Sequence, residues 1–222
     1  MSSSSLDKFI ITRKRKLYKF AAFKEMANCF DDDSWPIKKP ELINDKGLTI
    51  EVGAGTALFL TKLARNNPDM NFLAIDRKSD RLYTGAKFSI KENINNISYL
   101  WTNARHISKL LDANTVDNLW ITFPDPWPQE SNIKHRLTNK IFMSDYHKIL
   151  KPGHNLYFKT DNKALFDWTI ENIDQRLWQI DEKSYNLHVD AVKNRNALIM
   201  TSYEERYHQE GKPINYVSLI AK

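Results

Sequence analysis

Residues 48–67, LTIEVGAGTALFLTKLARNN, decide the fold. The stretch begins as an apolar run, turns at the glycine loop Gly53-Ala54-Gly55, and continues with apolar residues at helical spacing that stop before Pro68. Glycine lets a backbone turn tightly and approach a ligand closely. The stretch therefore predicts a strand, a tight loop and a helix, which together begin a βαβ unit.

The same alternation continues toward the C-terminus. Four further strands are predicted at 71–76, 97–102, 116–123 and 155–161, each followed by a helix, over 81–94, 106–112, 139–150 and 164–173. The last part is less regular, with a strand at 177–181, a helix over 203–211 that closes at Gly211, and a strand at 214–221. Alternating strands and helices indicate right-handed crossovers and a parallel sheet. Ligands of such sheets bind at the carboxyl ends of the strands.

The first 45 residues differ from the rest of the chain. They predict a basic arm, a helical stretch over 17–30 and a linker over 31–40, so we expect an N-terminal extension at 1–45 and one α/β domain at 46–222. The formal net charge is +6, and a polyanionic partner fits it, although such runs also occur on solvated faces. Five cations lie close together in the arm: Arg13, Lys14, Arg15, Lys16 and Lys19.

Several classes of protein do not fit the composition. No run approaches the roughly 20 apolar residues of a membrane span. The first residues lack the apolar segment of a secretory signal. A single cysteine, Cys29, excludes an intramolecular disulfide and a multi-cysteine zinc site, and the six histidines show no ligand spacing. We therefore expect a cytoplasmic protein with no membrane contact and no metal.

Acids and amides end successive predicted strands. Asp and Asn are common in turns and at helix N-caps, so one of them would carry little meaning. Five in succession, with glycines after the first, instead predict a ligand site at the carboxyl edge of the sheet. These positions are Glu51 (followed by Gly53 and Gly55), Asp76, Asn103, Asp125 and Asp161.

The glycine loop does not match a dinucleotide site. The motif G-x-G-x-x-G is incomplete because Leu58 stands at its last position, and Glu51 before the glycines would repel a pyrophosphate. A carboxylate there suits an ammonium or a sulfonium group. Asp76 lies 23 residues past Gly53, where it could bind the two hydroxyls of a ribose, and Asn103 could reach an adenine edge. Together these residues describe S-adenosylmethionine.

The stretch FPDPWP, residues 123–128, follows the strand predicted at 116–123. Proline lacks the N–H donor and fixes φ, so the strand ends here in a stiff loop that presents Asp125. In a methyltransferase of this type the loop lies beside the transferred methyl group, and Phe123 and Trp127 could stack on a planar base. The alternative is a rigid surface turn with Trp127 in the core.

With these motifs together, the chain resembles the bacterial tRNA (guanine-N7-)-methyltransferase family from about residue 47 onward. The resemblance rests on EVGAG, PDPWP with the basic KHR after it, KTD, and TSYEERYHQEG. It implies a Rossmann-like class I methyltransferase with a doubly wound, mostly parallel seven-stranded sheet, helices on both faces and an antiparallel last strand. It also implies methyl transfer from S-adenosylmethionine to N7 of a guanosine in tRNA, guanine 46 of the variable loop.

The resemblance assigns roles to individual residues. It places Glu51, Asp76, Asn103 and Asp125 at the cofactor, with Asp125 also as the catalytic acid. Two positions depart from the family. Asn103 replaces the usual Asp, and Gln129 replaces a frequent Lys, whose contact Lys134 or Arg136 could supply. The implied substrate-binding residues are Gln129, Asp161, Thr201, Ser202, Tyr203 and Glu204, and the expected tRNA contacts are Arg13, Arg15, Lys134 and Arg136.

Other functions stay open at this point. Methyltransferases of adenine N6 favour a D/N-P-P-Y/F loop, which FPDPWP approaches without matching, so another RNA or small-molecule methyltransferase is the first alternative. A non-catalytic RNA-binding subunit with the same fold is the second, and a complete cofactor pocket argues against it. Analysis of the methylated nucleoside separates these functions. The sequence leaves a monomer and a homodimer equally open.

Overall fold

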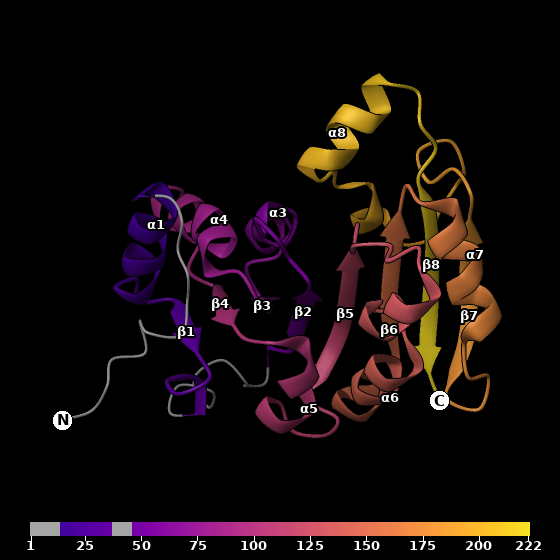
Figure 1. The fold of residues 1–222 in the computed structure, drawn as a ribbon, viewed down its shortest axis with the longest axis horizontal. Coiled ribbons are helices and arrows are strands. Elements are labelled where there is room, and N and C mark those ends of the chain that lie inside the picture. The colour runs from indigo at the N-terminus through magenta and orange to yellow at the C-terminus, as the bar shows by residue number, and fades with distance from the viewer. Residues whose placement is uncertain (1–13, 37–45) are drawn as a thin grey trace.

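An eight-stranded sheet runs through the molecule, with helices on both of its faces (Figure 1). The computed structural model describes residues 14–36 and 46–222. The strands are β1 Cys29–Asp31, β2 Leu48–Val52, β3 Asn71–Asp76, β4 Ile97–Trp101, β5 Val116–Thr122, β6 Leu150–Thr160, β7 Trp178–Ser184 and β8 Asn215–Ala221. The helices are α1 Lys14–Lys24, α3 Leu58–Asn66, α4 Ser79–Lys91, α5 Ile107–Leu110, α6 Lys140–Ile149, α7 Lys163–Asn172 and α8 Ser202–Gln209.

The order of the strands is β1-β4-β3-β2-β5-β6-β8-β7. β8 pairs antiparallel with both β6 and β7, and the remaining neighbours pair parallel. The predicted doubly wound α/β fold with an antiparallel last strand is therefore confirmed. From β2 the chain moves outward through β3 and β4, then crosses to β5 on the other side of β2. Their carboxyl ends meet at this switch point, where sheets of this kind bind ligands.

The sheet has eight strands rather than the predicted seven. The additional strand is β1, whose residues were predicted to lie in a helical stretch over 17–30 and the linker after it. The helix α1 ends at Lys24, and the chain then forms a short edge strand beside β4. Side chains alternate across a strand, and here Cys29 packs into the core on one face while Phe30 packs on the other. The division of the chain at residue 45 stays a prediction, although β1 belongs to the common sheet.

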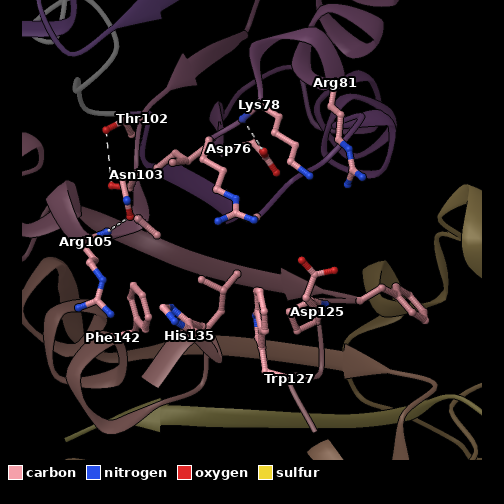
Figure 2. A pocket seen from close by; sticks show the side chains of 17 residues that line it. Asp76, Lys78, Arg81, Thr102, Asn103, Arg105, Asp125, Trp127, His135 and Phe142 are labelled. Atoms are coloured by element: carbon pink, nitrogen blue, oxygen red, sulfur yellow. Dashed lines mark hydrogen bonds between the residues drawn. The ribbon is translucent and has the colours of Figure 1, made fainter. Parts of the chain in front are cut away.

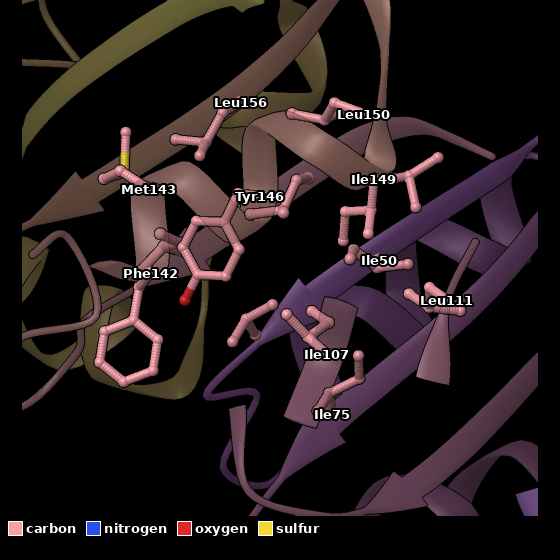
Figure 3. Packing of buried hydrophobic residues seen from close by; sticks show 14 of the residues in the cluster. Ile50, Ile75, Ile107, Leu111, Phe142, Met143, Tyr146, Ile149, Leu150 and Leu156 are labelled. Carbon is pink, nitrogen blue, oxygen red and sulfur yellow. The ribbon is translucent and has the colours of Figure 1, made fainter. Parts of the chain in front are cut away.

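Two apolar layers cover the sheet. One packs α1, α3 and α4 against one face, and the other packs α5, α6 and α7 against the opposite face. Figure 3 shows part of the second layer, where Phe142 and Tyr146 of α6 lie among apolar side chains of the sheet and of α5. Each fully buried side chain of this kind contributes about 1.5–3 kcal/mol, so the strand ends are held on a rigid base.

Candidate active site

Two adjoining pockets open where the carboxyl ends of the central strands meet. The Asp76 pocket lies between the ends of β3 and β4 and the loop FPDPWP (Figure 2). The Tyr203 pocket lies between the glycine loop, the end of β6 and α8. Both pockets are lined by Gly53, Arg81, Phe123, Pro124 and Asp125, so the two spaces share one boundary.

The glycine loop is bonded to the end of β3. Gly53 adopts φ +75°, and its N–H donates to the carbonyl of Ile75 at 2.9 Å. A Cβ at this glycine would lie 2.6 Å from Cδ1 of Leu137, so a larger residue would displace that side chain and strain the backbone. The N–H of Gly55 donates to Oδ2 of Asp76 at 2.8 Å. The loop and the carboxylate predicted for a ribose therefore form one unit.

Asp76 is buried in its pocket, which Lys78 and Arg81 also line. Its Oδ1 accepts from the backbone N–H of Lys78 at 2.8 Å. Burial raises the pKa of Asp76, while its two backbone hydrogen bonds and the charges of Arg81 and Lys78 act in the opposite direction. Each carboxylate oxygen keeps a further lone pair, which can accept from a hydroxyl group of a ligand.

Glu51 is a buried carboxylate with one unsatisfied oxygen. The side chain is only 1% exposed, and Oε1 accepts from the hydroxyl of Thr122 at 2.6 Å. Within the described residues Oε2 has no hydrogen-bond partner. Burial raises the pKa of Glu51 to about 8, against the hydrogen bond from Thr122 and the charge of Lys159. A buried oxygen of this kind requires a donor, and a cationic group of a ligand would supply one.

The loop FPDPWP stores backbone strain. Phe123 and Trp127 adopt φ of +48° and +43°, which costs a non-glycine residue about 1–3 kcal/mol. The N–H of Phe123 donates to the carbonyl of Lys159 at 2.9 Å. Arg136 fixes the other end, because its guanidinium donates to the carbonyls of Pro126 and Trp127 at 3.0 Å. Asp125 between them is exposed and lines both pockets.

The two rings expected to stack on a base, Phe123 and Trp127, both line the Asp76 pocket. Trp127 lines the Asp76 pocket, with its ring centre 5.2 Å from that of His135. Phe123 lines both pockets, and its ring centre lies 6.4 Å from Tyr203 and 6.2 Å from Tyr207. The loop is therefore part of the site rather than a surface turn with its tryptophan in the core.

The remaining predicted residues fall into two groups. Asn103 is exposed in the Asp76 pocket, and its Oδ1 accepts from the backbone N–H of Arg105. Asp161, Thr201 and Tyr203 line the other pocket. Four predicted contacts line neither pocket: Gln129, Lys134, Arg136 and Glu204.

Glu204, Arg136 and Gln129 have other partners. Glu204 is fully buried, with Oε2 2.8 Å from Nζ of Lys159. Arg136 is 8% exposed, and its guanidinium lies over the ring of Trp168, so the expected phosphate contact is wrong for this conformation. Gln129 accepts from Asn132 instead of lining the site.

The remaining expected tRNA contacts are only partly described. Lys134 is exposed, as a phosphate contact requires. Arg13 lies outside the described residues, and the side chains of Arg15 and Ser202 are not described. These three assignments therefore stay predictions.

The sequence reasoning missed Lys159. It is fully buried, and Nζ donates to the carbonyls of Ala197 and Ile199 and to Glu204. One signal was available, because a lysine in the middle of the predicted central strand 155–161 has little room to reach solvent. Tyr207 and Arg81 were missed as well, and nothing in the sequence distinguishes them from other residues on a polar helix.

The described part of the chain contains neither a membrane-spanning helix nor a metal-binding group. No helix there is long and apolar enough to cross a membrane. No group of three or more His, Cys, Asp or Glu side chains in the same part of the chain could hold a metal ion.

Comparisons with known proteins agree with this geometry. The family model described as "Putative methyltransferase" matches residues 45–217. The tRNA (guanine-N(7)-)-methyltransferase of Cytophaga hutchinsonii is 32% identical over 212 residues, which cover 92% of this chain and 96% of the relative. The enzyme of the same name from Lactobacillus johnsonii is 35% identical over 171 residues, covering 76% and 78%.

Solved structures show the same fold. The 16S rRNA methyltransferase KamB superposes with a TM-score of 0.62 at 18% identity, covering 87% of this chain and 95% of that one. An antibiotic-related methyltransferase superposes with a TM-score of 0.60 at 20% identity, covering 82% and 92%.

Proposed function

The chain belongs to the tRNA (guanine-N7-)-methyltransferase family, and we propose that it transfers a methyl group from S-adenosylmethionine to N7 of a guanine in tRNA. The observation that carries this proposal is the position of Asp125 on the boundary between two adjoining pockets. The residues that fit the cofactor line both pockets, Glu51 and Gly55 in one and Asp76 and Asn103 in the other, so the donor would span this boundary and the acceptor would lie beside Asp125. Guanine 46 of the variable loop is the proposed target, on the family resemblance.

The residues present fit S-adenosylmethionine. The unsatisfied oxygen of Glu51 would accept from a cationic group, and Asp76 would accept from the ribose hydroxyls. Asn103 would bind the adenine edge. The glycine loop lines the Tyr203 pocket and lets the ligand lie against the backbone. When bound, S-adenosylmethionine supplies an electrophilic methyl group on a positively charged sulfur.

The chemistry requires alignment more than proton transfer. N7 of guanine carries an in-plane lone pair and no proton, so it can attack the methyl carbon without a general base. As the N7–C bond forms and the S–C bond breaks, the positive charge passes from sulfur to the base. Asp125 would stabilise that charge, or orient the base by accepting from its N1–H and N2–H₂ edge. The protein would act on tRNA in the cytoplasm.

Incubation with labelled S-adenosylmethionine and unmodified bulk tRNA, followed by nucleoside analysis, tests the proposal. We expect 7-methylguanosine, and cleavage at the modified base should map it to guanine 46. A different methylated nucleoside would instead identify another RNA methyltransferase. Binding of tRNA without any transfer would point to an RNA-binding subunit.

Asp125→Asn tests the proposed catalytic residue. The amide keeps the shape of the side chain and removes its charge, so we expect single-turnover methylation at saturating cofactor to fall by about 10²–10³. Asp69→Asn is the matched control, because Asp69 is exposed and lines neither pocket. A rate for Asp125→Asn within about threefold of the wild type would leave Asp125 as a turn residue.

A further inference from the structure

Lys159 lies between two buried carboxylates. In the register of β5 with β6 it is opposite Thr122, the residue that donates to Glu51 at 2.6 Å. Glu51 is opposite Trp120, two residues before Thr122. Side chains alternate along a strand, so Glu51 and Lys159 leave the sheet on the same face. On the far side of Lys159, its Nζ lies 2.8 Å from Oε2 of Glu204. One ammonium group is therefore placed between the carboxylate proposed for the cofactor and the carboxylate that anchors α8.

Solvent does not reach this cluster of Glu51, Lys159 and Glu204. All three residues are at most 1% exposed. The ring of Phe59, which lines the Tyr203 pocket, lies over the ammonium, with 4.5 Å from Nζ to the ring centre. Lys159 itself lines neither pocket, so it would act on a ligand only through its neighbours. Because a buried charge is only weakly screened, its field extends to both carboxylates.

The charges of the cluster depend on one another. Burial raises the pKa of Glu51, while the hydrogen bond from Thr122 and the charge of Lys159 lower it. Burial lowers the pKa of Lys159, while the charges of Glu204 and Glu51 raise it. Glu51 and Lys159 thus each favour the charged form of the other. Three further titratable side chains face the cluster: Asp76, Lys62 and His188.

We propose that Lys159 is a positioning residue for the cofactor that acts through Glu51: its buried charge keeps the empty carboxylate ready to ionise and limits how tightly it then holds the cationic group of S-adenosylmethionine. The identity of this ligand rests on the proposed function. A proton and a cationic ligand bring positive charge to the same carboxylate, so Lys159 opposes both. It therefore changes the affinity little while Glu51 is protonated in the empty pocket, and lowers it once Glu51 is ionised.

Lys159→Met together with Glu204→Gln tests the proposal. The double change removes both charges of the buried pair, whereas Lys159→Met alone would leave Glu204 buried without its cation. Carbon-13 NMR of the glutamate carboxyl groups in the cofactor-free protein gives the pH midpoint of Glu51, and Glu51→Gln assigns its signal. In the wild type we expect a midpoint near pH 8. In the double variant the midpoint should rise by about one pH unit or more.

Lys62→Met together with Glu205→Gln is the matched control. It removes the same two charges from a pair of the same length, 2.8 Å, that is exposed rather than buried. Water screens such a pair, so the midpoint of Glu51 should stay within about 0.3 pH units of the wild type. An unchanged midpoint without Lys159, or an equal shift in both double variants, would overturn the proposal.

Calorimetry with S-adenosylmethionine relates the midpoint to the cofactor. At pH 6–7 the double variant without Lys159 should bind within about threefold of the wild type. Between pH 8 and 9 its affinity should rise further by up to about tenfold, while that of the wild type levels off. A purely structural role would instead weaken binding equally at every pH, and that result would overturn the proposal. If the wild type bound no S-adenosylmethionine, the proposed function would fail, and the NMR midpoints would still decide whether Lys159 acts on Glu51.

Discussion

At the scale of single residues, the site contains two carboxylates in opposite surroundings. Glu51 is buried under the sheet edge with one oxygen unsatisfied, and Asp125 is exposed on the loop above it. Burial disfavours a charge and raises the pKa of Glu51, so a cation beside it favours the ionised form. Asp125 lines both pockets from the exposed loop, where it can respond to charge that develops during the reaction. The two residues are thus suited to different tasks.

The raised pKa of Glu51 predicts how cofactor binding depends on pH. With a pKa of about 8, Glu51 is mostly protonated in the empty pocket at pH 6–7, and a cationic ligand must displace that proton. The affinity for S-adenosylmethionine should therefore rise roughly tenfold per pH unit from pH 6 and level off near pH 8. Calorimetry in two buffers with different ionisation heats should detect release of a proton at pH 7.

Glu51→Gln is the control for this prediction. The amide cannot titrate, so the pH dependence should disappear and the affinity at pH 8 should be lower than that of the wild type. An affinity of the wild type that stays constant from pH 6 to pH 8 would show that Glu51 is already ionised in the empty pocket. The unsatisfied oxygen would then need another explanation.

At the scale of the elements, α8 depends on a buried ion pair rather than on its own sequence. The helix Ser202–Gln209 has eight residues, too few to be stable alone. Glu204 joins it to Lys159 of β6, and His188 lies 3.3 Å from the other oxygen of the same carboxylate. The helix that carries Tyr203 and Tyr207 is thereby fixed to a central strand.

Glu204→Gln should destabilise the protein by about 3–5 kcal/mol, because it leaves the ammonium of Lys159 buried without its carboxylate. Urea unfolding measures the decrease in the free energy of unfolding. The double variant Lys159→Met with Glu204→Gln should recover part of it, since no buried charge remains. Glu205→Gln removes only an exposed pair with Lys62 and should cost less than about 1 kcal/mol. If Glu204→Gln unfolded like Glu205→Gln, the buried pair of Glu204 with Lys159 would contribute little to the stability of the protein.

The element scale also shows how far the sequence could predict this fold. Periodicity located the central strands and their helices, because each has one apolar face or an unbroken apolar run. It missed β1, since three residues are too few to show an alternation, and Cys29 and Phe30 fitted equally well as the end of a helix. Local patterns cannot reveal that a strand of so few residues finds a partner in β4, more than 60 residues away.

The same limit applies to the site. The acids at the strand ends were predictable, because parallel strands bring their carboxyl ends to one edge. The pairing of Lys159 with Glu204 was not, since it joins residues 45 positions apart across the topology. A motif also does not show which distant residue a side chain meets, so Glu204 and Arg136 were predicted to contact tRNA or the substrate base. Both lie in motifs that resemble the family, but their side chains turn into the protein and support the elements that reach the pockets.

At the scale of the whole molecule, positive charge gathers on the side of the sheet that opens to the pockets. Arg77, Arg81 and Arg105 line the Asp76 pocket. Beside them α1 packs on α4 and exposes Lys14 and Lys16 (Figure 1). Phosphates of a tRNA that reaches Asp125 through the Asp76 pocket would lie near these cations.

Salt dependence tests this arrangement. Each neutralised phosphate adds about 0.7–0.9 to the slope of log affinity against log salt concentration, so tRNA affinity should fall steeply with salt. Lys14→Gln with Lys16→Gln should reduce that slope by one to two units. Lys91→Gln with Lys148→Gln removes the same charge at the ends of α4 and α6, where each helix leads into its next strand, at the sheet edge opposite the pockets. This control pair should leave the slope unchanged. Equal effects of the two pairs would mean that tRNA responds to net charge alone and that α1 makes no direct contact.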